Sequence, residues 1–217
     1  ALLGLPLEIA LFSVGDFEKQ LADFIGVCRQ NRLNIKHLLL FSSQALVTPQ
    51  PLIDIIPALK EQLPNVKIGV GTDYNFTELN RHRFEAGEAD FVSCSFDPQE
   101  HASDDLSLME NTETVQYLVE SAENLYGKPV HVSFVSLRRR ANPYATNPAD
   151  FWLPIEKQQD KRQKAPFAKE WAQAVLQHLS QTRVVSVTMF RTVGELGLMN
   201  EEGEKYPVFD ALADFTK

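Results

Sequence analysis

The chain has 217 residues, of which 44% are hydrophobic and 23% charged. This composition is typical of a folded chain with a large core, and it argues against a collagen-like, disulfide-scaffold or disordered protein. The 21 basic and 29 acidic residues give a formal charge of -8, which would repel nucleic acid and anionic membranes, so neither is expected as a partner.

Two features of the sequence bear on its compartment. Cys28 falls in a helical pattern and Cys94 in an apolar run, which predicts two buried thiols rather than a disulfide or a metal pair. No apolar run reaches the roughly 20 residues that cross a bilayer. No basic segment precedes the apolar start, so no signal peptide is visible and a cytoplasmic location is favoured.

Six β-type runs alternate with helical patterns along the chain. The runs are LEIALFSV (7–14), KHLLLFSS (36–43), VKIGVGT (66–72), FVSCSF (91–96), PVHVSFVSL (129–137) and VVSVTMF (184–190). Apolar residues at helical spacing predict helices over about 16–31, 53–59, 113–125 and 166–179. Pro49 and Pro51 mark the start of the second helix, and Gly127 marks the end of the third.

The alternation predicts parallel βα units, which leaves a doubly wound sheet or a (β/α)8 TIM barrel. No glycine-rich phosphate loop follows any run, polar residues gather after successive runs, and a short helix, YPVFDALADF, closes the chain. We therefore predict an α/β chain of the (β/α)8 TIM-barrel type. A compact six-stranded open sheet is the alternative.

Six units are two fewer than a barrel needs. Residues 1–217 are accordingly interpreted as a single TIM-barrel-like domain that lacks the first two βα units and forms the C-terminal part of a larger barrel. An open barrel leaves two strand edges with unpaired backbone groups. Another chain or a further segment is therefore expected to complete it.

The segment FVSCSFDPQEHASDD (91–105) carries the densest group of titratable residues, directly after an apolar run. Within it, His101 is predicted to transfer protons, with Asp105 or Asp104 holding its imidazole in one tautomer. Gln99 is predicted to bind substrate. Asp104 and Asp105 could instead cap the helix that follows.

Two other segments supply candidate residues. In NFTELNR, Glu78 is predicted to be a general acid or base, with Asn75 and Arg81 binding substrate beside it, although Glu78 could simply favour a helix start. After the fifth run, strand alternation sends Arg138 away from Arg139, and Arg138 with Asn142 suits a carboxylate or a developing oxyanion.

No metal signature is visible. His131 is expected to be structural because it begins a strand, and no constellation is assigned to the remaining histidines, His37, His82 and His178.

Four motifs together resemble the D-apionate lactonase family. They are GTDYNFTELNRHR, SFDPQEHASDDLSL, PVHVSFVSLRRRANPYAT and SVTMFRTVGELGLM. The resemblance implies a glycosidase-like TIM barrel that hydrolyses carbohydrate lactones, with the six runs as barrel strands three to eight. At the end of the last strand, where the family pattern has Glu-Thr-Thr-Gly, this chain has Arg191-Thr-Val-Gly, and Arg191 is assigned to substrate binding.

The function expected from these residues is hydrolysis of a sugar-acid lactone, with water activated by general acid and base groups at the barrel mouth. A glycoside hydrolase-like protein is one alternative. A sugar-acid-binding relative without catalysis is another, because Arg191 reverses the charge of the expected glutamate. The sequence leaves open whether the protein is an enzyme. No cofactor or metal is expected, since no nucleotide or zinc motif occurs.

Overall fold

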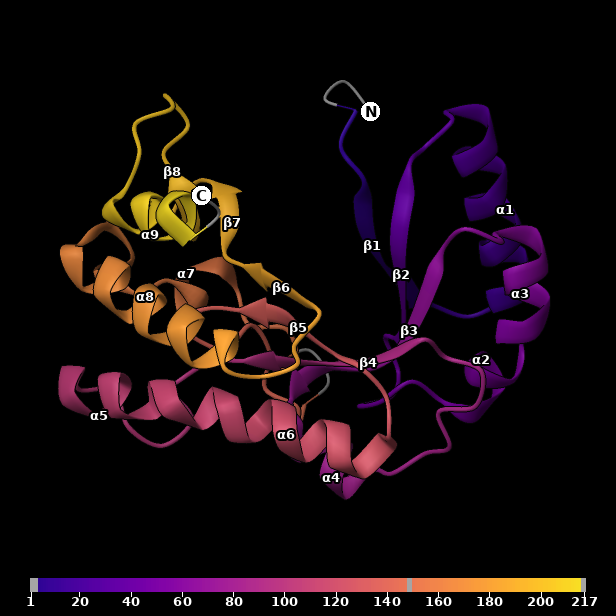
Figure 1. Ribbon diagram of the computed structural model, residues 1–217, viewed down its shortest axis with the longest axis horizontal. Helices are drawn as coiled ribbons and strands as arrows, with labels where there is room; N and C mark the ends of the chain where they lie inside the picture. The colour runs from indigo at the N-terminus through magenta and orange to yellow at the C-terminus, as the bar shows by residue number, and fades with distance from the viewer. Residues whose placement is uncertain (1–3, 148–149, 216–217) are drawn as a thin grey trace.

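A computed structural model describes residues 4–147 and 150–215 of the chain. Six parallel strands form one sheet in the order β1-β2-β3-β4-β5-β6, which is also their order along the sequence. The strands are β1 (Leu7–Ser13), β2 (Ile35–Ser42), β3 (Lys67–Asn75), β4 (Phe91–Phe96), β5 (Val130–Val135) and β6 (Ser186–Met189). A doubly wound sheet changes direction part-way, whereas this order continues around a barrel. The TIM-barrel prediction is confirmed, as a curled partial barrel (Figure 1).

Helices cover the outer side of the curled sheet (Figure 1). The helices in the described residues are α1 (Phe17–Gln30), α2 (Gln50–Asp54), α3 (Ile56–Gln62), α4 (Phe76–Arg81), α5 (Asp105–Glu110), α6 (Thr114–Tyr126), α7 (Ile155–Gln158), α8 (Pro166–Ser180) and α9 (Pro207–Phe215), with 3-10 turns at Asn111–Glu113 and Lys161–Lys164. Two short strands, β7 (Arg191–Val193) and β8 (Gly197–Met199), pair outside the main sheet and were not predicted.

Local sequence signals explain the helix ends. Asp16 precedes α1 and its carboxylate accepts the backbone N–H of Lys19 over 3.1 Å, as an N-cap residue does. Gly127 ends α6 in the left-handed conformation at φ 61°, which glycine adopts without steric cost. Cys28 and Cys94 are both free and buried, as predicted.

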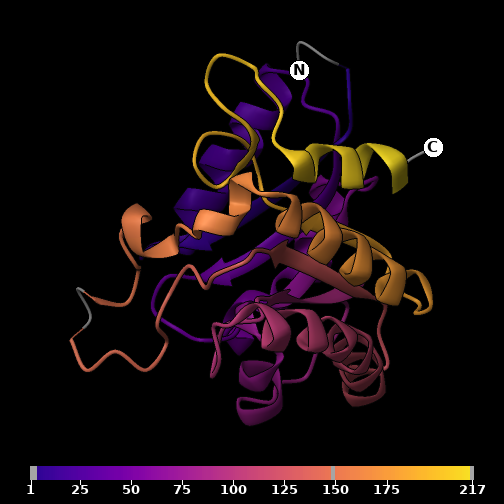
Figure 2. The same ribbon diagram turned by 90° about the vertical axis from the view of Figure 1, so that its left-hand side faces the viewer.

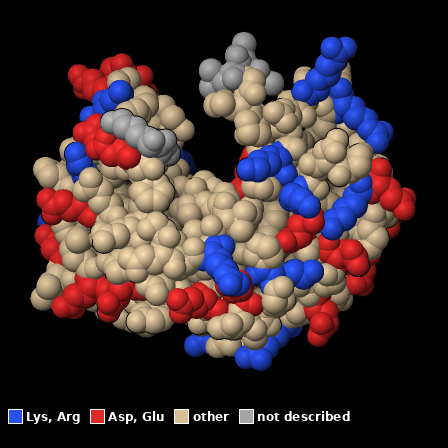
Figure 3. Space-filling model, in the orientation of Figure 1, with Lys and Arg blue, Asp and Glu red and all other residues tan. Residues whose placement is uncertain are grey.

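The barrel is open on one side. β1 pairs only with β2 and β6 only with β5 in the described sheet. Figure 3 shows the molecule hollowed between its N-terminal and C-terminal parts.

Figure 2 shows the long segment after β5 reaching out beyond the body of the molecule. Within the described residues, no helix has the length and apolar character needed to cross a membrane.

Candidate active site

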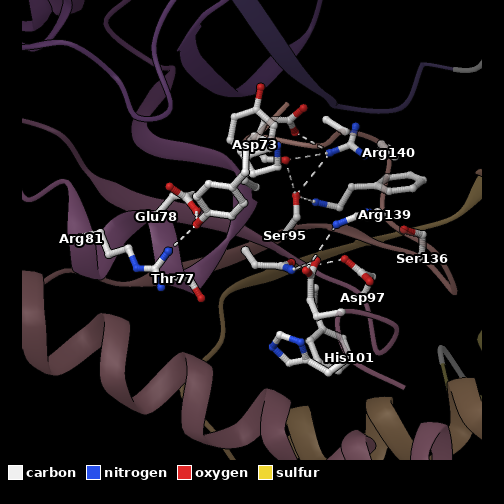
Figure 4. A pocket seen from close by; sticks show the side chains of 18 residues that line it. Asp73, Thr77, Glu78, Arg81, Ser95, Asp97, His101, Ser136, Arg139 and Arg140 are labelled. Atoms are coloured by element: carbon white, nitrogen blue, oxygen red, sulfur yellow. Dashed lines mark hydrogen bonds and ion pairs between the residues drawn. The ribbon is translucent and has the colours of Figure 1, made fainter. Parts of the chain in front are cut away.

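A pocket opens at the C-terminal ends of β3, β4 and β5, where TIM-barrel enzymes bind their substrates (Figure 4). Helix α4 and the loop after β4 supply two of its walls, and the segment after β5 supplies a third. The charged residues that line it are Asp73, Glu78, Arg81, Asp97, Glu100, His101, Arg139 and Arg140. Four carboxylates thus share a small space with three guanidinium groups.

Among the carboxyl groups that line the pocket, Asp97 has the pKa that departs furthest from its ordinary value. It follows the last residue of β4 and is 9% exposed. Burial, and then the negative charge of Glu100, raise the pKa of Asp97 to about 7, against weaker lowering by hydrogen bonds from Gln99 N–H and Asn75. Near neutral pH, Asp97 can therefore either accept or release a proton.

Asn75 connects Asp97 to Glu100. Its side-chain amide nitrogen lies 2.7 Å from Glu100 Oε1 and 3.3 Å from Asp97 Oδ2. Asn75 occupies the N-cap position of α4 but makes no side-chain capping bond there. The amide is thus available to the pocket rather than to the helix.

Glu78 lies in the first turn of α4 and is 2% exposed. Its Oε1 accepts a short hydrogen bond from the Tyr144 hydroxyl, which in turn accepts one from Arg81 over 2.7 Å. Its Oε2 lies 3.5 Å from His82 Nε2 and has no hydrogen-bond partner among the described residues. Glu78 is thus a buried carboxylate of the pocket wall, held by Tyr144 on one oxygen and close to His82 on the other.

Two of the three arginines of the pocket, Arg139 and Arg140, differ in how firmly they are held. Arg140 Nη2 lies 2.5 Å from Asp73 Oδ1 and 3.3 Å from Ser95 Oγ, and the guanidinium packs over the ring of Phe134 at 4.6 Å. Arg139 Nη1, in contrast, lies 3.7 Å from Glu100 Oε2, which is beyond hydrogen-bond distance. Of these two arginines, Arg139 therefore has more N–H groups free to donate to a ligand (Figure 4).

The structure brings together some of the residues predicted from sequence and separates others. Glu78, His101, Asn75 and Arg81 line the pocket. Asp105 lies outside it, where its carboxylate pairs with Arg162 at 2.8 Å, and Asp104 caps α5. In the described part of the chain, His101 therefore has neither aspartate as its partner, and the expected convergence of His101 with Asp105 is wrong.

The other four residues assigned to substrate binding are not among those that line the pocket. Gln99 Nε2 donates to Leu137 O at 2.5 Å and to Asp160 Oδ2 at 2.7 Å. Arg138 donates to the backbone of Gln159, and Asn142 accepts the N–H of Tyr144 over 3.3 Å. Arg191 is exposed on β7. Their predicted role in binding stays a prediction.

Strand alternation failed for the three arginines because β5 ends at Val135, before they begin. Arg139 and Arg140 both line the pocket, while Arg138 donates to the backbone carbonyl of Gln159 instead. Asp97 was likewise left out of the predicted site, although the proline after it signals the turn that holds it at the strand end.

The expectation that His37 belongs to no constellation is also wrong. At the opposite end of the strands, His37 and His131 both contact Glu8. This cluster lies apart from the pocket residues.

Comparison with known proteins agrees with the sheet topology. The family model described as D-apionate lactonase, TIM barrel domain, matches residues 2–217. The chain belongs to this family. A D-apionate lactonase from Brucella anthropi is 31% identical over 176 residues, which cover 76% of this chain and 29% of that protein. The chain thus spans less than a third of the length of its lactonase relative.

Solved structures share the fold of this lactonase-family chain at low identity. A β-1,3-glucanosyltransferase from Rhizomucor miehei, solved with laminaritriose, superposes with a TM-score of 0.60 at 16% identity and covers 95% of this chain and 76% of its own. A GH128 endo-β-1,3-glucanase from Amycolatopsis mediterranei, in complex with laminaripentaose, gives 0.54 at 13% identity, with coverage of 94% and 80%. These likenesses show the TIM-barrel fold and no more.

Proposed function

We propose that the protein hydrolyses the lactone of a sugar acid at the pocket formed by β3, β4 and β5. The observation that carries this proposal is the buried Asp97, whose pKa is raised to about 7 beside the loosely held guanidinium of Arg139. A base that is half-ionised near neutral pH and a nearby cation are the two groups that ester hydrolysis needs. Membership of the D-apionate lactonase family supports a lactone as substrate.

In the proposed reaction, Asp97 accepts a proton from a water molecule as the water oxygen attacks the lactone carbonyl. Arg139 stabilises the negative charge that develops on the carbonyl oxygen. The tetrahedral intermediate then collapses, the bond to the ring oxygen breaks, and protonated Asp97 returns the proton to that oxygen. The product is a hydroxy acid, and Asp97 is again ionised.

Glu78 and His101 retain their predicted roles as proton-transfer groups at the edge of this reaction. Glu78 is tied to Tyr144, which orients its carboxylate, and His101 is exposed on the opposite loop. Both suit contact with substrate hydroxyls at least as well as contact with the carbonyl. The experiment must therefore compare them directly with Asp97.

The test is a pH-stat assay of the full-length protein on a panel of aldonolactones, beside aryl glycosides. Asp97→Asn is expected to lower kcat at least about 100-fold, the size of a general-base contribution. Asp105→Asn is the matched control, since Asp105 lies outside the pocket. Retention of lactone hydrolysis by Asp97→Asn would contradict the mechanism, and loss in Glu78→Gln or His101→Ala alone would transfer the role to those residues.

Arg191 favours a second function, binding of a sugar acid without turnover, because it stands where the family pattern has a glutamate. No turnover on any lactone, combined with a rise in melting temperature in the presence of aldonic acids, would support binding. Turnover on glycosides alone would support a glycosidase.

We also propose that two further βα units close the barrel. The outer edges of β1 and β6 have no strand partner within the described sheet, and an apolar cavity lined by Val185, Val187 and Leu212, among others, lies beside β6. Hydrogen exchange tests this: the amides of β1 and β6 should be protected in the full-length protein and less protected in residues 1–217 alone. Equal exchange in both would argue against closure.

A further inference from the structure

Two histidines and a glutamate meet at the end of the sheet opposite the pocket. Glu8 belongs to β1, His37 to β2 and His131 to β5, each near the start of its strand. Glu8 Oε2 lies 2.9 Å from His37 Nδ1 and 3.2 Å from His131 Nδ1. One ligand atom from each of the three residues lies within 4.8 Å of the other two.

The surroundings hold these side chains in place. His37 is 7% and His131 1% exposed. The ring of Phe91 stacks on His131 at 3.6 Å and meets His37 edge-on at 5.5 Å. The other carboxylate oxygen, Glu8 Oε1, accepts a hydrogen bond from Thr188 on β6 over 3.1 Å. Outer contacts of this kind orient the ligands of metal sites.

We propose that Glu8, His37 and His131 bind a divalent transition-metal ion of the zinc type. Imidazole nitrogens and a carboxylate oxygen are ligands that zinc prefers, and neutral imidazoles can turn both Nδ1 lone pairs to one ion. Ligands at zinc distances in tetrahedral geometry lie roughly 3.3 Å apart, close to both measured contacts of Glu8 Oε2. A fourth position is left for water.

The position of the cluster indicates a structural role for the ion. It lies at the N-terminal end of the strands, where barrel residues serve stability rather than catalysis. The three ligands tie β1 and β2 to β5, and Glu8 also contacts β6 through Thr188. An ion here would join β1 and β2 to β5, at the end of the barrel opposite the pocket.

Cobalt and zinc titrations of chelator-treated full-length protein test the proposal. We expect one Co²⁺ per chain, with the visible bands of a four-coordinate site, displaced by Zn²⁺. Zinc at a hundredfold excess over its dissociation constant should raise the melting temperature by roughly 5–10 °C. Glu8→Gln should weaken zinc binding at least about 100-fold, while His178→Gln, a helix histidine outside the cluster, should leave it unchanged.

X-ray absorption of the zinc-loaded wild-type protein gives an answer even where Glu8→Gln fails to fold. Two imidazole ligands at about 2.0 Å and one carboxylate oxygen are expected. Absence of saturable one-to-one binding, fewer than two imidazoles, or equal loss of binding in His178→Gln would overturn the proposal. The three residues would then form a hydrogen-bonded polar cluster that binds no ion.

Discussion

Asn75 donates its side-chain amide to Glu100 over 2.7 Å although it stands at the N-cap position of α4. Asparagine at that position usually accepts a backbone N–H of the first helical turn, which is worth about 1 kcal/mol. Helix α4 lacks this capping bond. The Asn75 side-chain amide instead links the end of β3 to Glu100 in the loop after β4. The same amide donates to Asp97 over 3.3 Å, and this hydrogen bond lowers the pKa of Asp97.

Asn75→Ala should therefore affect the reaction more than the fold. No cap is lost, so the free energy of unfolding should change by less than about 1 kcal/mol. The hydrogen bond from Asn75 lowers the pKa of Asp97, so its loss should move the acidic limb of the kcat/KM profile to higher pH. A profile that keeps its midpoint would show that Asn75 does not influence the titrating group.

Asp97→Asn should stabilise the protein at alkaline pH. Because the pKa of Asp97 is raised on folding, its contribution to stability is present below the pKa of the unfolded chain and is lost as pH rises through about 7. Asparagine resembles the protonated form and escapes this loss. Denaturant unfolding should show the variant more stable by upwards of about 1 kcal/mol at pH 8, and little different at pH 4.

Glu100→Gln should move the acidic limb in the opposite direction from Asn75→Ala. The charge of Glu100 raises the pKa of Asp97, so removing that charge should let Asp97 ionise at lower pH. The midpoint of the kcat/KM profile should fall by about half a unit or more. Asp105→Asn removes a carboxylate outside the pocket and should leave the midpoint unchanged.

Gly69→Ala should destabilise the fold by about 1–3 kcal/mol, the usual effect of overpacking. A Cβ atom at Gly69 would lie 2.1 Å from the ring of Phe91, which packs against both histidines of the Glu8 cluster. Gly26→Ala is the matched control. Gly26 lies on an exposed part of α1 with open space around it, so alanine there should stabilise by roughly 0.5–1 kcal/mol. Equal effects at both sites would contradict the packing argument.

Arg191→Glu restores the residue type of the family pattern but should leave lactone turnover within about twofold of wild type. Arg191 is exposed on β7 and does not line the pocket. Steady-state kinetics on the full-length protein check this. A tenfold rise would indicate that the position reaches the substrate once the barrel is complete.

Much of the fold could be predicted because its signals are local. The run 91–96 is a strand with those bounds. Asp16 stands at the start of α1 as a capping carboxylate, and Gly127 stands at the end of α6 in the left-handed conformation. The strands β7 and β8 could not be predicted, since each is three residues long and shows no clear alternation. Strand order followed from the number and spacing of the βα units.

The candidate site was predictable only in outline. The segment after β4 was recognised as the densest titratable group, and Glu78 and His101 do line the pocket. Asp97 could not be singled out from the sequence, because the burial that raises its pKa depends on packing between distant strands. Glu8 and His131 are 123 residues apart, so no spacing rule connects them.

The contact between Glu8 and Thr188 joins positions 180 residues apart, which bears on the order of folding. Contacts between neighbouring βα units can form as each unit appears, whereas this one requires the whole sheet. At synthesis rates of about 5–20 residues per second, roughly 10–40 s separate the two residues on a ribosome. During that interval Glu8 can already pair with His37 on β2, while its contact with Thr188 waits for β6. The last of these contacts to form therefore fixes β1 relative to β6.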